Sequence, residues 1–177
     1  MDYALPWDRT TLVWTLATAG VLLTLTAVSA FWWRSALRNE APIWPPLLAG
    51  TICLGSLIAM ASVAPLGVSI EGSRMRIRRP VGSAVYDLSQ VTSVQVVPFE
   101  EVFSGWTIRI FGVGGPFGLI GRFRSPSLGA FRAAVTHRGT LVLLRFHEGL
   151  PLALSPVSAQ ALAESVRRAN ASDSGKR

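Results

Sequence analysis

Charged residues are missing from two long stretches near the start of this 177-residue chain, and the apolar pattern changes after them. No charge interrupts Thr10–Trp33 or Ala41–Ile70, so the two stretches are 24 and 30 residues long. A helix needs about 20 apolar residues to cross a hydrocarbon core of roughly 30 Å. Aromatic residues at 31–33 and Trp44 flank the short connection, as in an interfacial aromatic belt. The pattern therefore predicts two antiparallel transmembrane helices.

A cleavable signal peptide is the alternative interpretation of the first stretch. Residues 28–30, Val-Ser-Ala, resemble a small-residue cleavage site. The segment before the stretch carries two acids and one Arg, however, whereas a signal peptide begins with a positively charged region. We therefore expect the first stretch to remain as a membrane helix.

Beyond Pro65–Gly67 the apolar residues recur at every second position, which is typical of strands with one buried face. Three such sets are each predicted to share a face: Trp106, Ile108 and Ile110; Val142, Leu144 and Phe146; and Leu150, Leu152 and Leu154. Turn residues separate the alternating segments. We therefore expect seven short antiparallel strands.

Two segments of this second part depart from the alternating pattern. The segment 111–129 contains six glycines and two prolines, so we predict that it forms no regular strand. After Ser155-Pro156, a predicted cap followed by a first-turn proline, Leu162 and Val166 lie one helical turn apart. This spacing predicts a terminal amphipathic helix, followed by a disordered tail.

The stretch Gly114–Pro156 resembles the bacterial PH-domain (pleckstrin-homology-like) membrane proteins. The shared features are a glycine–aromatic loop, a Gly-x-Phe alternation and a Ser-Pro before the last helix, and the two preceding membrane helices match a common arrangement in that family. The resemblance implies an α+β membrane protein, with a two-helix transmembrane hairpin and then a PH-like seven-stranded antiparallel β-barrel or sandwich capped by a C-terminal α-helix. It implies no enzymatic role.

The expected organisation is a tail at 1–9, membrane helices at 10–33 and 44–66, a loop at 34–43, a PH-like domain at 67–170 and a tail at 171–177. Arg9 and four arginines at 74–79 lie on one side of the predicted membrane, and Arg34 and Arg38 lie on the other. The positive-inside rule then predicts a multi-pass protein of the cell (inner) membrane with both termini in the cytoplasm.

The net charge of +7 arises entirely after residue 66, where 14 basic residues face seven acids. Arginine binds phosphate bidentately, and each Arg near an anionic leaflet contributes on the order of 1 kcal/mol. The candidate surface for an anionic lipid or a partner comprises Arg74, Arg76, Arg78, Arg79, Arg122 and Arg124. The alternative is an ordinary solvated strand face in an Arg-rich chain.

The glycine-rich segment offers a second candidate site. Its apolar residues Phe117, Leu119, Ile120 and Phe123 are interleaved with two of these arginines. Exposed, they would enter the headgroup region as a membrane-interface loop. Packed, they would cover one edge or end of the barrel, and the resemblance favours packing.

The sequence offers no recognisable catalytic or metal-binding set. The only cysteine, Cys53, lies inside the second apolar stretch, and His137 and His147 both fall in predicted turns. Glu100 and Glu101 are adjacent on a segment predicted to be extended, so they would point in opposite directions. We expect no enzyme activity, no cofactor, no metal, no nucleic acid and no small-molecule substrate.

The expected function is a membrane-anchored, non-catalytic scaffold or regulatory module at the membrane surface. Its expected partners are the lipid bilayer, through anionic headgroups, and a partner protein or a second copy of the chain. The alternative is an accessory subunit of a membrane transporter or envelope complex, which would dock through its transmembrane helices. Small residues on both helices would permit such docking.

Overall fold

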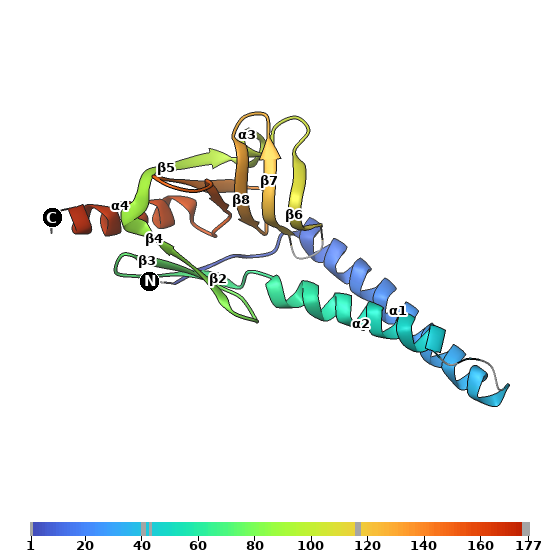
Figure 1. The fold of residues 1–177 in the computed structure, drawn as a ribbon. Helices are drawn as coiled ribbons and strands as arrows, with labels where there is room; N and C mark the ends of the chain where they lie inside the picture. Colours follow the sequence, from blue (N-terminus) through green and yellow to red (C-terminus); the bar gives the residue numbers. More distant parts are fainter. Residues whose placement is uncertain (1, 40–41, 43, 116–117, 175–177) are drawn as a thin grey trace.

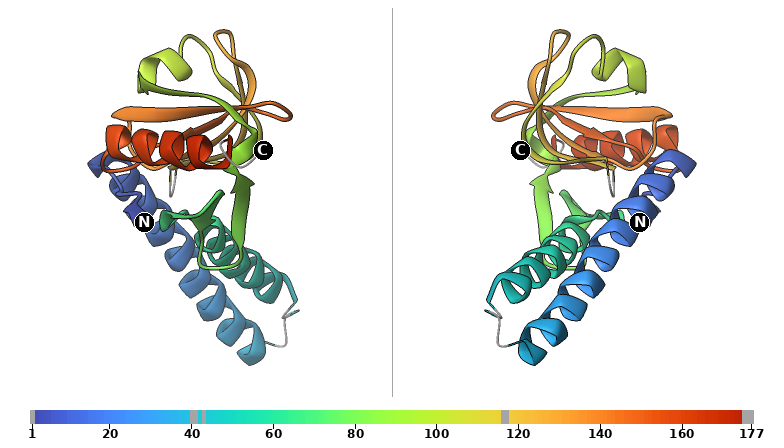
Figure 2. Two further views of the ribbon diagram at one scale, coloured as in Figure 1. Left: turned by 90° about the vertical axis from the view of Figure 1, so that its left-hand side faces the viewer. Right: turned by 90° about the vertical axis from the view of Figure 1, so that its right-hand side faces the viewer.

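The computed structural model describes residues 2–39, 42, 44–115 and 118–174. An apolar helical hairpin projects from one side of a β-rich domain (Figure 1). The hairpin consists of α1 (Arg9–Arg38) and α2 (Trp44–Val63), which lie side by side in both views of Figure 2. Both helices are long and apolar enough to cross a membrane.

The hairpin is almost entirely uncovered by the rest of the chain. No residue of α2 is buried, and α1 buries only Thr11, Thr15 and Ala36. The helices approach closely at Gly50, where an added Cβ would lie 3.5 Å from the Cβ of Ser29. The long apolar faces of both helices therefore lack a protein partner within the described residues.

A four-stranded antiparallel sheet follows the hairpin, with the order β1-β2-β3-β4. The strands are β1 (Asp2–Ala4), β2 (Gly67–Glu71), β3 (Arg74–Arg78) and β4 (Ser83–Asp87). The outermost strand, β1, comes from the segment before the hairpin and pairs with β2. The domain is therefore assembled from both sides of the hairpin in the sequence.

A six-stranded sheet has the order β5-β9-β10-β8-β7-β6. The strands are β5 (Val91–Pro98), β6 (Ile108–Gly115), β7 (Gly118–Ser125), β8 (Gly129–Val135), β9 (Thr140–Phe146) and β10 (Leu152–Leu154). A 3-10 turn, η1 (Leu88–Gln90), leads from the first sheet into this one, and a short helix, α3 (Phe99–Val102), follows β5. The pair β8 and β10 is parallel.

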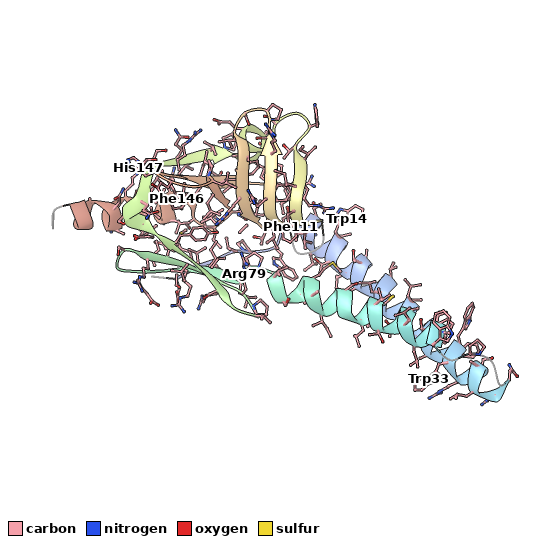
Figure 3. The ribbon with its side chains drawn as sticks, viewed as in Figure 1. Trp14, Trp33, Arg79, Phe111, Phe146 and His147 are labelled. Carbon is pink, nitrogen blue, oxygen red and sulfur yellow. The ribbon has the colours of Figure 1, made fainter. Side chains whose placement is uncertain are left out.

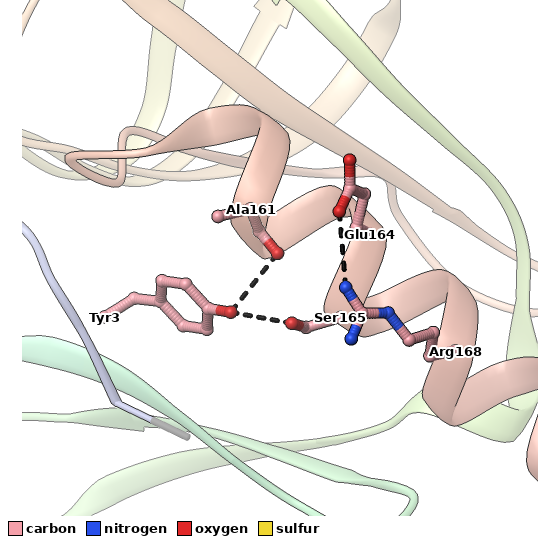
Figure 4. Close-up of polar contacts among 5 residues, drawn as sticks. All are labelled: Tyr3, Ala161, Glu164, Ser165 and Arg168. Carbon is pink, nitrogen blue, oxygen red and sulfur yellow. Dashed lines mark hydrogen bonds and ion pairs between the residues drawn. The ribbon is translucent and has the colours of Figure 1, made fainter.

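The last helix, α4 (Ala159–Ser174), helps to form the core between the two sheets. Its Leu162 and Val166 are fully buried with Ile77 of β3 and Leu144 of β9. The Tyr3 hydroxyl of β1 lies 2.6 Å from the Ser165 hydroxyl and donates to the Ala161 carbonyl at 3.2 Å (Figure 4). A second cluster on the other face of the six-stranded sheet includes four phenylalanines: Phe99, Phe103, Phe123 and Phe131.

The predicted order of two apolar helices, a β-rich domain and a C-terminal helix is confirmed, but for the predicted seven-stranded barrel or sandwich the strand number and the closed barrel are wrong. The described chain forms ten strands in two sheets, which do not close into a barrel. Strand β7 and the second part of β6, residues 111–115, come from the glycine-rich segment that was predicted to form no strand. Gly112 and Gly121 face each other there at φ of 120° and 134°, and a Cβ on either would come within 2.1–2.2 Å of a backbone oxygen. Glycine is therefore what allows these strands to pair.

Two local predictions also differ from the structure. Ser155 does not cap the last helix, which begins at Ala159; its hydroxyl instead accepts the backbone N–H of Thr136 at 2.7 Å. α4 continues to Ser174, four residues into the stretch predicted as a tail. Strand β9 buries Val142 and Leu144 on one face, as predicted, but Leu141 and Leu143 are buried on the other. One face packs against α4 and the four-stranded sheet, and the other packs against α3 and other strands of the same six-stranded sheet.

Candidate functional site

Both helices of the hairpin are attached to the β domain by hydrogen bonds. At the end of α2, the Val81 N–H donates to the Ser62 carbonyl at 3.3 Å, and the Leu66 N–H donates to the Arg78 carbonyl at 2.9 Å. At the start of α1, the Thr11 hydroxyl donates to the Thr136 carbonyl. The hairpin is therefore fixed to the four-stranded sheet at one helix and to the six-stranded sheet at the other.

Asp8 stabilises the start of α1. Its Oδ1 accepts the Thr11 N–H at 2.6 Å, and its Oδ2 accepts the Arg138 N–H at 3.2 Å. Burial by itself would raise the pKa of Asp8, but the hydrogen bonds from Thr11 and Arg138 and the charge of Arg138 outweigh it and lower the pKa. Asp8 is therefore a charged cap that also bonds to the loop between β8 and β9.

A pocket of about 600 Å³ lies between the two sheets, where α2 joins the domain. Met60 and Val63 of α2 line one side, Tyr86 of β4 lines another, and β6, β7, β8 and β10 complete the wall. Phe111, also in the wall, is 77% exposed and lies with Arg79 on the side of the domain nearest α2 (Figure 3). The volume falls within the roughly 300–1,000 Å³ of small-molecule sites.

Three arginines converge on this pocket: Arg79, Arg122 and Arg132. Arg122 and Arg132 are directly opposed in the antiparallel register of β7 and β8, so their side chains share one face of the sheet. The Nε of Arg79 is buried and has no hydrogen-bond partner within the described residues. None of the described lining residues is acidic. The arrangement therefore suits a compact anion.

The predicted candidate arginines divide into two groups. Arg79 and Arg122 reach the pocket, whereas Arg74, Arg76 and Arg78 point away from the core, because Met75 and Ile77 between them are buried in it. Arg74 is opposed to Glu71 and Asp87 in register, and Arg78 forms an ion pair with Asp2 at 3.7 Å. Arg124 is exposed on β7 and does not line the pocket. The six predicted arginines therefore do not form one continuous site in the structure.

Arg132 is the pocket arginine that sequence reasoning missed. It lies in a predicted strand, but the signal that identifies it is its register opposite Arg122, which exists only once β7 has formed from the glycine-rich segment. No spacing in the sequence reveals that pairing.

The predicted membrane-interface loop is packed rather than exposed where it is described. Ile120 and Phe123 are 5% and 4% exposed, Leu119 is half-buried, and Phe117 lies outside the described residues. The exposed apolar side chains lie instead on and beside the edge strand β6: Trp106, Ile108, Ile110 and Phe111. Trp106, Ile108 and Ile110 are 77%, 44% and 52% exposed, so the expectation of a buried face for them is wrong.

Three titratable residues outside the pocket, His137, Glu100 and Glu101, were considered as catalytic candidates. His137 accepts the Gly139 N–H at Nδ1, and its Nε2 lies 3.2 Å from the Pro156 carbonyl, so a neutral ring with its proton on Nε2 satisfies both contacts. Glu100 and Glu101 are exposed on α3, not on an extended segment as predicted. Within the described ranges, no three His, Cys, Asp or Glu residues are grouped so that they could hold a metal ion.

An apolar helical hairpin that carries a two-sheet β domain, completed by a C-terminal helix, defines the class of protein. Within it, residues 66–170 match the family model described as the bacterial PH domain, and the chain therefore belongs to this family, as its sequence suggested. No curated protein and no solved structure matches the chain significantly. PH-like domains are generally non-catalytic modules, and such a domain is compatible with a scaffold or binding role.

Proposed function

We propose that this chain is a membrane-anchored, non-catalytic PH-domain module that binds anionic lipid headgroups at the membrane surface. The observation that carries the proposal is the place of the arginine-lined pocket, which has Met60 and Val63 of an apolar helix in its wall. Only residues 64–66 separate α2 from β2. A bilayer around α2 would therefore lie directly beside the three pocket arginines.

The exposed surface of the hairpin supports membrane insertion. Large apolar side chains along both helices are more than 40% exposed, among them Leu16, Leu23, Ile52 and Ile58. Exposure of this surface to water would cost about 25 cal/mol of free energy for each Å² of apolar area. Trp32, Trp33 and Trp44 lie at the end away from the domain, where an aromatic belt would stand.

The pairing of β1 with β2 supports the same topology. It places the segment before α1 and the domain after α2 on the same side of any membrane that the hairpin crosses. Two crossings satisfy this condition. The basic residues on that side favour the cytoplasm, hence the inner membrane with both termini inside.

A protein partner is the second candidate, favoured by the edge strand β6. The outer edge of β6 is unpaired within the described sheet, and its Ile108, Ile110 and Phe111 are exposed. Exposed edges with apolar side chains favour pairing with another chain. A photoreactive group in place of Ile110 would capture such a partner in native membranes, whereas contact with the bilayer would yield only lipid adducts.

Hydrogen exchange of the full chain in nanodiscs tests the proposal. We compare discs of phosphatidylcholine alone with discs that also contain phosphatidylglycerol. Residues 79–82 and 108–113, close to α2 and its pocket, should exchange more slowly in the anionic discs, and β9 should be unchanged as an internal control. Identical exchange of all three segments in both kinds of disc would contradict binding at the anionic surface.

A further inference from the structure

The opposition of Arg122 and Arg132 is unfavourable in the protein alone. Like charges directly across an antiparallel pair repel each other and destabilise the sheet. In this position the pair shares one face with Phe111, which is opposed to Arg122 on β6, and that face lines the pocket. An anion held between the two guanidinium groups would remove the repulsion.

Arg79 adds a second unsatisfied group to the same pocket. Buried N–H donors nearly always have a hydrogen-bond partner, so an unpaired Nε calls for an acceptor that the described chain does not supply. Phosphate oxygens are suitable acceptors because a guanidinium group binds them through two parallel hydrogen bonds. Arg79, Arg122 and Arg132 together are opposite in charge to a phosphate and supply enough donors for its oxygens.

Two of the three arginines of β3, Arg74 and Arg78, show how an arginine outside the pocket is neutralised within the chain. Arg78 has a carboxylate partner in Asp2, and Arg74 faces two acidic residues across neighbouring strands. The pocket arginines have no acidic neighbour among the described lining residues. The contrast indicates that the negative charge for the pocket comes from outside the chain.

The rest of the pocket wall is apolar. Tyr86, Phe111 and Leu152 line it from the sheets, and Met60 and Val63 line it from α2. A free inorganic anion would gain nothing from this apolar surface. A ligand that carries both a compact anionic group and an alkyl part would bury the alkyl part there.

We propose that the pocket between the two sheets binds a single amphiphile with a phosphate headgroup, held by Arg79, Arg122 and Arg132, whose alkyl part follows Met60 and Val63 along α2. The proposal rests on the membrane placement of the hairpin given under the proposed function. It makes the domain a receptor for one anionic lipid molecule rather than a surface that is attracted to negative charge in general.

The test uses the full chain in a non-ionic detergent, titrated with phosphatidic acid or with phosphatidylcholine. Native mass spectrometry measures retained lipid, and thermal unfolding measures the stabilisation that a bound ligand confers. We expect phosphatidic acid to form a 1:1 complex and to raise Tm, and phosphatidylcholine to do neither. Equal retention of the two lipids would overturn the proposal.

A matched pair of double variants separates the pocket from net charge. Arg122→Gln with Arg132→Gln removes two charges from the pocket, whereas Arg145→Gln with Arg168→Gln removes two charges from positions outside it; all four side chains are exposed. The pocket variant should bind phosphatidic acid roughly tenfold more weakly or worse, and the control should stay within about twofold of the native chain. Equal losses in both variants would overturn the proposal.

Thermal unfolding without lipid shows whether the pocket variant, Arg122→Gln with Arg132→Gln, is folded. Without lipid, it should unfold at a temperature no lower than the native chain, because the repulsion between the two arginines is gone. If its Tm falls instead, Arg122→Lys replaces it, since Lys keeps the charge but cannot form two parallel hydrogen bonds. A loss of phosphatidic acid binding in this variant supports the proposal, and unchanged binding overturns it.

Glycerol 3-phosphate and inorganic phosphate identify the source of the anion. They should raise Tm less than phosphatidic acid does, because they lack the alkyl part; an equal rise would indicate a soluble phosphate ligand and overturn the amphiphile. Failure of the proposed function is seen separately, as unchanged hydrogen exchange in anionic nanodiscs, because the detergent titration needs no bilayer surface.

Discussion

The Thr11 hydroxyl, in the first turn of α1, donates a buried 2.9 Å hydrogen bond to the Thr136 carbonyl, which directly follows β8. The two residues are 125 positions apart in the sequence. The bond fixes the first helix of the hairpin to the six-stranded sheet, while Ser62 at the end of α2 is bonded to the turn between β3 and β4. The hairpin thus bridges the two sheets that enclose the pocket.

Thr11→Val should lower the free energy of unfolding by about 1 kcal/mol. Valine keeps the shape of the side chain but removes the hydroxyl, and a typical hydrogen bond contributes about 0.5–1.5 kcal/mol. Thermal unfolding in detergent measures the change. Thr24→Val is the matched control, since the Thr24 hydroxyl bonds within its own helix, to the exposed Gly20 carbonyl. Equal effects of the two substitutions would contradict a tertiary role for Thr11.

Asp8→Asn should make the stability of the chain depend less on pH in the acidic range. The pKa of Asp8 is lowered in the folded protein, so its charged form contributes stability that is fully present above the ordinary value of 3.8. That contribution is lost as the pH falls through the lowered pKa. We expect the Tm difference between the native chain and the variant to be constant above about pH 5 and to shrink below pH 3.8. A difference that persists unchanged to pH 2 would refute a charged cap.

Gly121→Ala should destabilise the chain by at least about 2 kcal/mol, because an alanine Cβ would lie 2.2 Å from the Phe111 carbonyl oxygen at a φ of 134°. Gly129→Ala is the control: its φ is 69°, but an added Cβ meets nothing within 4 Å, so only about 1 kcal/mol should be lost. Denaturant unfolding distinguishes the two. A smaller effect at Gly121 than at Gly129 would count against the close pairing of β6 and β7.

Tyr3→Phe and Ser165→Ala should be coupled by about 1 kcal/mol in a double-mutant cycle, because the hydroxyls of Tyr3 and Ser165 lie within hydrogen-bond distance. Tyr3→Phe combined with Ser158→Ala, an exposed serine just before the same helix, should be additive within about 0.5 kcal/mol. The comparison measures how far β1, which precedes the hairpin, stabilises the domain after it. Additivity in both cycles would show that β1 contributes nothing through this contact.

Much of the local structure could be predicted from sequence patterns with a strong physical cause. The uncharged stretches predicted two long apolar helices, and the alternation around Met75 and Ile77 predicted β3 with its buried and exposed faces. The turns at His137 and His147 were also predicted, since glycine and polar residues there interrupt the alternation. Each of these features depends on neighbours close in sequence.

The features that failed depend on contacts between distant residues. Glycines 112 and 121 weaken a strand when considered alone, yet opposite each other they let two strands pair closely. Ser155 followed by Pro156 has the composition of a helix cap. Its hydroxyl oxygen instead accepts a hydrogen bond from the N–H of Thr136, 19 residues earlier. β1 is too short to be recognised without β2 beside it.

The sequence by itself determined an apolar hairpin and an Arg-rich β domain, because composition and periodicity are local properties of the chain, and its motifs in Gly114–Pro156 resembled the bacterial PH-domain family. Only the tertiary structure decided which arginines act together. Register placed Arg132 opposite Arg122, the end of β3 turned Arg79 toward them, and the outward face of β3 separated Arg74, Arg76 and Arg78 from the pocket. The physical reason is that charges interact through distance in space, and strand pairing sets that distance.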